Sequence, residues 1–572
     1  MGRMPSPEPR PPHRDEAGAA RRPDARIARA RDADDHLSGT VPDAASTVFA
    51  DAREALAWFD AECDDLIAAV YGDHGPAAVH LPAYLAAYLR RRGRTREGIE
   101  IQTRARDASR RIGDRNAEAV SWNNLGNALH DACRFDEAVH AHTTARELHR
   151  ELGDAEGEAM AWNNLGNSLR AVHRFFDAVE AHTAARDIYR RTGNRTGAAG
   201  AWNNLGNALR EMRLLEDSAH AHTTARDLHR ELGDAEGEAV AWNNLGTSLR
   251  HLGRAEEAIE AYRRALGLYR RTGDDAGAAG AWNNLGNALQ DTRGFDEAIE
   301  AHTAARELHR RLGDPHGEAM ACYNLGNTLR ELDRTNDAVR AYRDSVGLYR
   351  RTGDHRNESE AWNNLGNTLE QGNRGGEAVH AFERARDLAR RAGDTRSEAM
   401  MWNNLGGALK RAGRVDEAAR ALERACDLGL RSGDRGEAAK AWNNLGNLLG
   451  EAGRGADAVQ ALARAQDLYR HAGDRGGEAI ASFNLANTLD EEGDRTGAVH
   501  AYTRSCDLFR EAGERRYEAM AWNNLGLVLG EEDRPAEAVH ALEQAARAYR
   551  DSWDPEGLAG AEAELERLRR LL

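Results

Sequence analysis

The chain has 572 residues, and its formal net charge at pH 7 is −16. Such an acidic chain lacks the basic footprint that nonspecific nucleic-acid binding requires, so nucleic acid is not an expected partner. Its five cysteines are scattered without a C-x-x-C pair, and neither an apolar leader nor a long apolar run occurs, so we expect a soluble, cytoplasmic protein without disulfides or membrane contact.

The first 40 residues are expected to form a disordered tail. Half of the twelve prolines lie there, together with many arginines and acidic residues and very little to bury. A denser helical pattern follows from Ala52 to Tyr71, with apolar residues such as Trp58 and Leu66. It predicts that the segment 41–76 holds a helix that caps the rest of the chain.

From residue 77 to about 550 the chain repeats itself every 40 residues. The phrase Trp-Asn-Asn-Leu-Gly-Asn starts at Trp122, and its register returns eleven times, while 77–114 is a degenerate first copy with Pro82 at the Trp position. A period of this length predicts a solenoid, in which each unit buries its apolar face only against its neighbours. We therefore expect an all-α, right-handed solenoid (superhelix) of about twelve two-helix repeats, closed by a capping helix over 551–572.

Each unit is predicted to contain two helices with clear end signals. Gly153-Asp154 combines a glycine that ends one helix with an aspartate that caps the next. The first helix should then run to about Arg170, and the second from Phe175 to about Thr192. Gly-Asp pairs recur at the same place in most repeats, so these boundaries should hold along the array.

The residues that carry the pattern resemble the tetratricopeptide repeat: Trp162, Leu165, Gly166 and Leu169 in the first helix, and Ala178, His182 and Ala185 in the second. The 40-residue length is similar to the Leu-Gly-Asn repeats of spindle-orientation scaffolds, which hold extended peptides in a groove. A looser similarity exists to the repeat arrays of actinobacterial STAND-type regulators. The resemblance implies a concave groove that binds a protein or peptide segment.

Catalytic and metal-binding motifs are not found. The two lysines, Lys410 and Lys440, lie outside any P-loop pattern, and H-E-x-x-H and G-x-S-x-G are missing. One repeat position holds histidine in some repeats and apolar residues in others: His142, His182, His222 and His302, against Tyr262, Tyr342, Phe382 and Leu422. This exchange favours packing over metal binding. We expect no enzyme activity, no cofactor and no metal.

Two rows of asparagines are candidates for the groove, because a rotation of 100° per residue places them beside the packing face. The first row is Asn123, Asn163, Asn203, Asn243, Asn283, Asn363, Asn403, Asn443 and Asn523. The second row is Asn127, Asn167, Asn207, Asn287, Asn327, Asn367, Asn447 and Asn487. Their amides could hold a peptide backbone, or bond within and between helices. For Asn164 and its equivalents a structural role is favoured.

Charge and aromatic residues complete the predicted groove. Arg170, Arg210, Arg250 and Arg330 form a basic stripe in the first half, which predicts an acidic partner segment, whereas acidic residues follow in the second half. The alternative is that these charged residues simply face solvent and bind no partner. Tyr323 and Phe483 each stand one residue after a lost Trp. Their rings could be binding anchors in the groove, or could turn inward to fill the space of the Trp.

The sequence thus predicts a non-catalytic scaffold for proteins or peptides. A second hypothesis is a detached sensor arm that regulates a separately encoded signalling ATPase or transcriptional regulator. The partner and the oligomeric state cannot be derived from the sequence.

Overall fold

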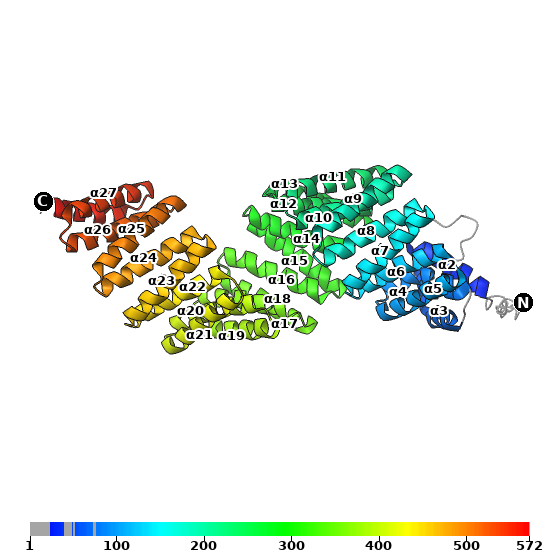
Figure 1. Cartoon of the computed structure of the whole chain (residues 1–572), viewed down its shortest axis with the longest axis horizontal. Coiled ribbons are helices and arrows are strands. Elements are labelled where there is room, and N and C mark those ends of the chain that lie inside the picture. The colour runs from blue at the N-terminus through cyan, green and yellow to red at the C-terminus, as the bar shows by residue number, and fades with distance from the viewer. Residues whose placement is uncertain (1–22, 39–48, 50–51, 73–75, 571–572) are drawn as a thin grey trace, which may run out of the picture. The chain divides into compact units, whose positions relative to one another are not determined.

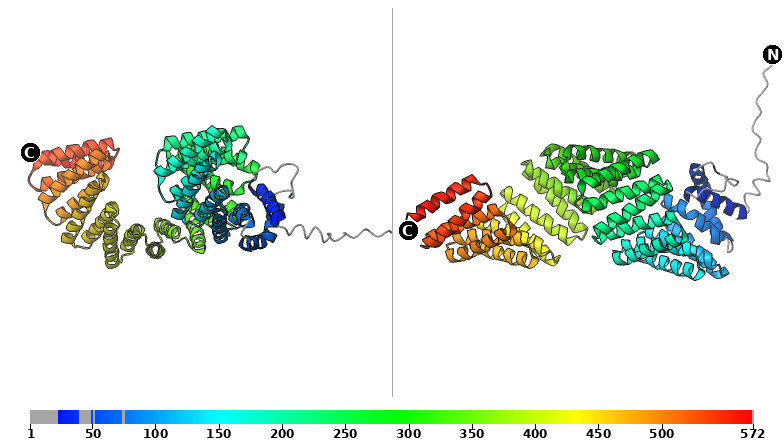
Figure 2. Two further views of the ribbon diagram at one scale, coloured as in Figure 1. Left: turned by 45° about the vertical axis from the view of Figure 1, so that its right-hand side comes forward. Right: turned by 90° about the horizontal axis from the view of Figure 1, so that it is seen from above.

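The computed structural model describes residues 23–38, 49, 52–72 and 76–570, and every regular element in them is a helix. The chain divides into two compact units, residues 1–292 and 293–572. Figure 1 labels the helices in chain order, and Figure 2 shows them from two more directions. In the described part of the chain, no helix has both the length and the apolar character needed to cross a membrane.

The helices of the first unit are α2 Pro23–Ser38, α3 Ala52–Gly72, α4 Pro76–Arg91, α5 Thr95–Ile112, α6 Arg115–Asp131, α7 Phe135–Leu152, α8 Ala155–Ala171, α9 Phe175–Thr192, α10 Arg195–Glu211, α11 Leu215–Leu232, α12 Ala235–His251, α13 Ala255–Thr272 and α14 Asp275–Asp291.

The helices of the second unit are α15 Phe295–Leu312, α16 Pro315–Glu331, α17 Thr335–Thr352, α18 His355–Gln371, α19 Gly375–Arg391, α20 Thr395–Arg411, α21 Val415–Arg431, α22 Arg435–Glu451, α23 Gly455–Ala472, α24 Arg475–Glu491, α25 Arg495–Ala512, α26 Arg515–Glu531, α27 Pro535–Asp551 and α28 Pro555–Arg569.

The helix boundaries follow from the end signals in the sequence. Gly153 ends α7 in the left-handed conformation, with φ of 72°, which glycine adopts without strain. The Asp154 side chain then accepts a hydrogen bond from the Gly157 amide at the start of α8. The predicted boundaries of α8 and α9 are correct to within a residue. At Glu514, which replaces the aspartate, no such side-chain bond forms.

The N-terminal segment differs from the prediction. Helix α2 lies within the first 40 residues, for which disorder was expected, and its Ala30 and Ala33 are buried. The Arg29 guanidinium stacks over the rings of Phe49 and Trp58, and α2 packs against α3 and α4. Small alanines let α2 lie close to its neighbours, a contact that composition alone does not reveal. Residues 1–22 lie outside the described part.

Within each unit, the packing order shows which helices line the inner side of the array. Every helix packs against the next one in sequence, and the first helices of successive repeats also touch each other, as α6, α8, α10 and α12 do. Their outer partners, such as α7 and α9, make at most marginal contact with each other. The first helices therefore lie on the shorter, concave side, and the second helices on the convex side.

A glycine in each first helix brings the two helices of a repeat together. A Cβ atom built on Gly166 would stand 2.6 Å from the ring of His182, so the ring lies directly on the backbone of α8. The same contact joins Gly126 to His142, Gly206 to His222, Gly246 to Tyr262, Gly326 to Tyr342, Gly366 to Phe382, Gly406 to Leu422 and Gly446 to Leu462. An alanine takes the glycine's place in two repeats: Ala86 in the degenerate first repeat and Ala486 in the repeat of Tyr502.

The histidines of this row are core residues, as predicted. His142, His182 and His222 are at most 1% exposed. Burial, and to a smaller extent the neighbouring charge, lowers the pKa of each ring to about 3; the neighbour is His130 for His142, Arg170 for His182 and Arg210 for His222. In the described residues, no cluster of three or more His, Cys, Asp or Glu side chains could hold a metal ion. The rings are neutral packing groups at physiological pH.

We expect acidification to destabilise the first unit through these three histidines. Each ring stays neutral in the folded chain but takes up a proton in the unfolded chain, where the histidine pKa is near 6.5. The stabilisation is therefore complete above pH 6.5 and is lost below it, by up to about 1.4 kcal/mol per histidine and pH unit. Urea unfolding at pH 7 and pH 5 measures the loss.

The control for this prediction is the variant His142→Phe/His182→Phe/His222→Phe, because Phe382 fills the same position in the second unit. Its loss of stability between pH 7 and pH 5 should be smaller than that of the unmodified chain. An equal loss in both proteins would show that other groups cause the acid sensitivity.

Candidate peptide-binding groove

The concave face is formed by one side of each first helix. In α8, Leu165 and Leu169 are buried against neighbouring helices, each 4% exposed. The opposite side of the same helix is half-buried or exposed and carries Met160, Asn163, Asn164, Asn167 and Arg170. Because the other sides of α8 are covered by α7 and α9, this open side faces the inner surface of the array. Here "concave face" means these positions and their equivalents.

An amide ladder joins the first helices along the concave face. Asn164 Nδ2 donates to Asn123 Oδ1 of the previous repeat at 3.1 Å. The same bond recurs at 2.8–3.2 Å from Asn204 to Asn163, Asn244 to Asn203, Asn284 to Asn243, Asn404 to Asn363, Asn444 to Asn403 and Asn484 to Asn443. The second asparagine of the phrase, Asn164 and its equivalents, therefore has the structural role that the sequence favoured.

The first predicted row is thus the acceptor side of this ladder. Its members Asn123, Asn283, Asn363 and Asn443 are less than a tenth exposed. His182 Nδ1 also lies 3.0 Å from Asn163 Oδ1. For this row the structure corresponds to the second interpretation, bonding between helices. A ligand can reach at most the amide nitrogens of its half-buried members.

The second predicted row is different. Its side chains are all half-buried, and two of them bind tyrosines: Tyr342 OH donates to Asn327 Oδ1 at 2.6 Å, and Tyr502 OH donates to Asn487 Oδ1. The others make no side-chain hydrogen bond to any described residue: Asn127, Asn167, Asn207, Asn287, Asn367 and Asn447. These amides are the ones that the concave face offers to a ligand.

The two asparagine rows should respond differently to truncation. Asn164→Ala removes a ladder bond and leaves Asn123 Oδ1 without its donor, which should cost about 1 kcal/mol of unfolding free energy relative to Asn167→Ala. Both changes replace Asn by Ala in the same helix, so the gain in helix propensity cancels. Urea unfolding of the two variants measures the difference. Equal stabilities would mean that the ladder does not hold the repeats together.

The basic stripe is partly neutralised within the fold. Arg250 Nε donates to Asp291 of the next repeat at 2.6 Å, and an Arg330 nitrogen lies 3.6 Å from Glu331. Arg170 and Arg210 have no ion pair with any described carboxylate. Burial lowers the pKa of Arg210, the Arg170 charge adds to this effect, and the Glu211 carboxylate opposes it. The stripe is thereby reduced to two charges on α8 and α10.

In the second unit the same positions carry opposing charges. Lys410 pairs with Glu451 at 2.7 Å, and Arg411 pairs with Glu370. Burial, followed by the charge of Glu531, raises the pKa of Asp490. The concave face of this unit is therefore neutral or acidic, in agreement with the change of sign that the sequence shows.

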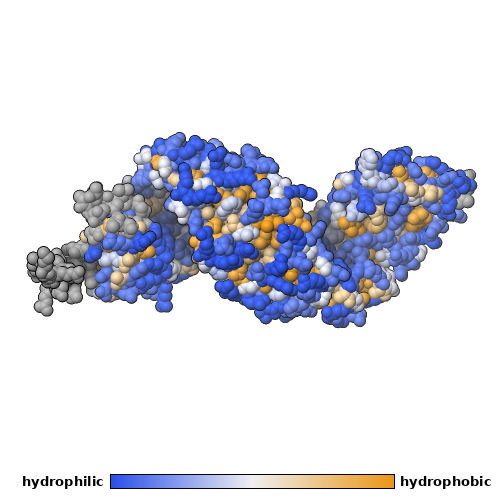
Figure 3. Space-filling model, turned by 180° about the vertical axis from the view of Figure 1, so that it is seen from behind, coloured by the Kyte–Doolittle hydropathy of each residue, from blue (hydrophilic) through white to orange (hydrophobic). Residues whose placement is uncertain are grey.

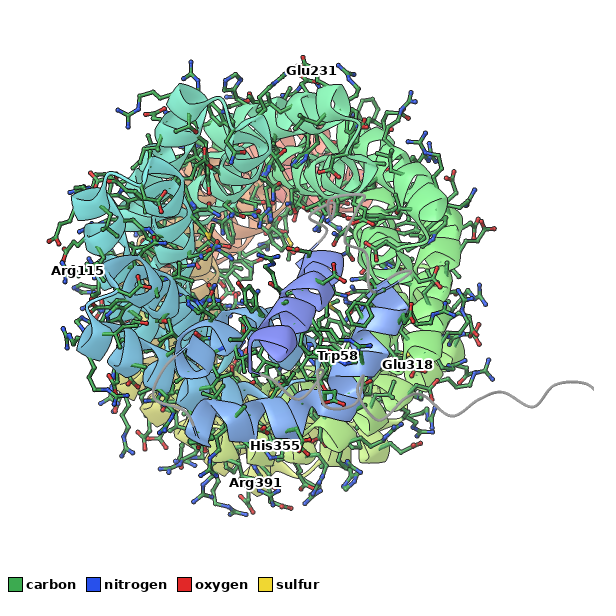
Figure 4. All side chains as sticks on the ribbon, turned by 90° about the vertical axis from the view of Figure 1, so that its right-hand side faces the viewer. Trp58, Arg115, Glu231, Glu318, His355 and Arg391 are labelled. Atoms are coloured by element: carbon green, nitrogen blue, oxygen red, sulfur yellow. The ribbon has the colours of Figure 1, made fainter. Side chains whose placement is uncertain are left out.

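The Trp row lies away from the concave face. Trp162 is half-buried, and the Arg146 guanidinium of the preceding second helix stacks 4.5 Å from its ring centroid. Trp162 Nε1 donates to Glu158 at 3.4 Å. The convex side, by contrast, carries exposed ion pairs: Figure 4 shows Arg115 and Glu231 on the outer rim of the first unit, where they pair with Glu151 and Arg195. The tryptophans thus join repeats. A pure packing role would require them to be fully buried, but Trp162 is only half-buried.

Tyr323 and Phe483 pack against tyrosines of their own repeats. Their rings meet those of Tyr342 and Tyr502 edge-on, with centroids 5.9 and 5.8 Å apart. Tyr323 OH also accepts a hydrogen bond from Asn364 Nδ2 at 2.8 Å, in place of the missing ladder asparagine. Both rings are half-buried against the core. Tyr323 thus takes the place of a ladder asparagine through its hydroxyl group.

The two residues that replace a tryptophan, Ser482 and Cys322, have different surroundings. In one repeat, Gln466 replaces the stacking arginine and donates to Ser482 Oγ at 2.7 Å. In the other repeat, Arg306 remains, Cys322 is buried, and Arg306 Nε has no hydrogen-bond partner in the described residues. Tyr323 also packs against the buried cluster around Cys322.

Tyr323→Ala should therefore reduce stability, since it removes a ring contact and the hydrogen bond from Asn364. We expect a loss of about 2–4 kcal/mol, as for truncation of a partly buried aromatic. Tyr323→Phe keeps the ring and should lose only about 1 kcal/mol. Thermal or urea unfolding measures both. If Tyr323→Ala unfolds like the unmodified chain, the ring is available as a binding anchor instead.

One part of the concave face was missed in the sequence. Met160 lies beside the ladder, because Asn123 Nδ2 approaches Met160 Sδ to 3.5 Å. It is 49% exposed, and Val240 at the same repeat position is 39% exposed. The signal was visible between residues 160 and 280 as a position that switches between an apolar residue and glycine from one repeat to the next.

The repeat can be assigned to a known family. A model of the tetratricopeptide repeat matches residues 77–151, 197–271, 277–351, 357–430 and 437–511, and a second model of this repeat matches 519–552. These matches cover well over half of the chain. The chain belongs to the tetratricopeptide repeat family. The sequence matches no curated protein.

Several solved structures are similar to parts of this tetratricopeptide array. The apo form of RapI shares 14% identity over 69% of this chain and 98% of its own, with a TM-score of 0.44. The apo quorum sensor NprR from B. thuringiensis shares 15% over 59% and 99%, with a TM-score of 0.41. BtubC from P. vanneervenii shares 19% over 38% and 92%, with a TM-score of 0.35. The family assignment rests on the repeat models, not on these likenesses.

Proposed function

We propose that the chain is a non-catalytic scaffold whose first unit binds an acidic peptide segment on its concave face. The observation that carries the proposal lies on α10. Asn207 Oδ1 and Arg210 Nη1 are both buried, and neither has a hydrogen-bond partner among the described residues. The two residues are about one helical turn apart. Buried polar atoms without partners are costly, so a ligand that fills both would gain free energy.

The chemistry of these atoms indicates what the ligand offers. Arg210 donates through a planar guanidinium, which suits a carboxylate, and Asn207 accepts, which suits a backbone N–H group. Arg170 on the neighbouring helix adds a second positive charge that lowers the pKa of Arg210. A carboxylate between the two guanidinium groups would relieve their repulsion. A peptide with Glu or Asp side chains has both kinds of group.

The second hypothesis, a detached sensor arm of an ATPase or transcriptional regulator, would use the same groove. Co-purification of such a protein with the chain would favour it. The cytoplasmic location also stays a prediction.

The double variant Arg170→Gln/Arg210→Gln tests the proposal. The probe is a fluorescent synthetic peptide of Glu and Ser residues. Its affinity should fall by roughly tenfold or more, since charge-assisted bonds to buried groups contribute about 1.5–3 kcal/mol each. Its dissociation rate should also depend less on salt concentration. Fluorescence anisotropy and stopped-flow dissociation measure the two effects.

A matched control is Arg134→Gln/Arg254→Gln. These arginines pair with Glu137 and Glu257 on the second helices, so the same loss of charge occurs away from the concave face. This variant should bind the peptide as the unmodified chain does. If both double variants weaken binding equally, the effect comes from net charge; if neither does, the first-unit groove is not the binding site.

A further inference from the structure

From α8 to α14 of the first unit, one position on the concave face alternates between a large apolar residue and glycine. It stands two residues before the Trp position: Met160 on α8, Gly200 on α10, Val240 on α12 and Gly280 on α14. The alternation has a period of 80 residues, two repeats. Further along, the apolar residues Met320, Met400 and Ile480 alternate with the charged residues Glu360 and Lys440. Val120 before this stretch and Met520 after it do not follow the alternation.

The apolar members are not explained by packing within the fold. Met160 and Val240 are 49% and 39% exposed. They stand on a face whose other side chains are amides and arginines. An apolar side chain contributes to folding only when it leaves water, and these two remain largely in it.

The glycines are not explained by packing either. A Cβ atom built on Gly200 or Gly280 would meet no atom within 4 Å, and neither residue has a positive φ. The glycines of the Leu-Gly-Asn phrase differ, since a ring or a leucine side chain lies against them, as His182 does against Gly166 and Leu422 against Gly406. Glycine inside a helix is unfavourable relative to alanine. Gly200 and Gly280 therefore leave open space on the concave face that the fold itself does not require.

We propose that Gly200 and Gly280 are the floors of two seats for large apolar side chains of the partner, with Met160 and Val240 as apolar walls. The inference rests on the proposed function and specifies its ligand: an acidic, extended segment with two apolar side chains about six residues apart. Arg170 lies on α8 with Met160, and Arg210 lies on α10 with Gly200. Their positive charges complement the acidic side chains of the segment.

The spacing follows from helix geometry. First helices of successive repeats are in contact, so their axes are ~10 Å apart. Two repeats then span ~20 Å, which an extended chain covers in about six residues at ~3.3 Å each. A helical ligand, rising ~1.5 Å per residue, would need about thirteen. The unengaged amide of Asn207 favours the extended form, because a helix has already used most of its backbone N–H groups.

The proposed segment needs carboxylates in addition to its two apolar side chains. The orphaned Asn207 Oδ1 and Arg210 Nη1 lie on the same side of α10 as Gly200, about 10 and 15 Å further along the helix axis. An apolar segment without carboxylates would bury the guanidinium without a counter-charge, which is unfavourable. The partner therefore needs both groups, with at least one carboxylate that reaches Arg210, about 15 Å along α10 from the Gly200 seat.

Four fluorescent peptides of Glu and Ser test the proposal on the full chain. Three carry two leucines, spaced three, six or thirteen residues apart, and the fourth has none. We expect the six-residue spacing to bind at least tenfold more tightly than the leucine-free peptide. Gly200→Met should remove most of this gain, because the added side chain fills the seat. It meets open space and improves helix propensity, so the variant should fold.

The matched control is Gly267→Met on α13. Gly267 is also a helical glycine facing open space, but it lies on a second helix, away from the concave face. This variant should keep the full gain from the leucines. The leucine-free peptide should bind both variants equally.

Three results would overturn the inference while leaving the acidic groove in place: no gain from leucines, an equal gain at all spacings, or an unchanged gain in Gly200→Met. Best binding at thirteen residues would overturn the extended form and assign a helical ligand. If the leucine-free peptide also fails to bind, the proposed function itself is wrong.

Discussion

A hydrogen bond between asparagine side chains of successive first helices sets the spacing of the concave face. Each such helix donates to the repeat before it and accepts from the repeat after it, as Asn164 does toward Asn123 and Asn163 does from Asn204. An amide has both a donor and an acceptor, so one residue type can extend the ladder. The next asparagine, one turn later, remains available. Two neighbouring asparagines of one phrase thus differ: Asn164 is bonded between repeats, whereas the side chain of Asn167 has no partner in the described residues.

Much of the fold could be predicted from local signals. Gly153 and Asp154 determine helix ends through the backbone of a few adjacent residues, and Gly166 and His182 meet within one helix pair. Such short-range relations are visible in a repeating sequence. The rotation of 100° per residue also placed Asn163 and Asn167 on the correct side of α8.

The binding role of each residue could not be predicted in the same way. The partner of Asn163 is 41 residues away in sequence, and so is the partner of Arg250. A strict period shows that both groups recur, but not whether one repeat reaches the next. Helix α2 was missed because its contacts depend on small alanines. Two signals were available: the alternation of Met160 and Gly200, and the joint change of Gln466 and Ser482.

The distribution of ion pairs explains why a few charges on the concave face can determine binding. Many outer arginines lie within a turn of a carboxylate, as Arg134 does beside Glu137, and hydrophilic residues cover most of the face in Figure 3. Such exposed pairs add little stability, but they cancel each other's field. The positive charges of Arg170 and Arg210 are not paired in this way, although the chain as a whole carries a net charge of −16.

The acidic ligand that we propose would therefore be repelled by the chain at long range and attracted only on contact. Salt should screen the repulsion and speed association, while it weakens the contacts and speeds dissociation. Selectivity for the ligand then depends on the contacts within the groove rather than on electrostatic steering.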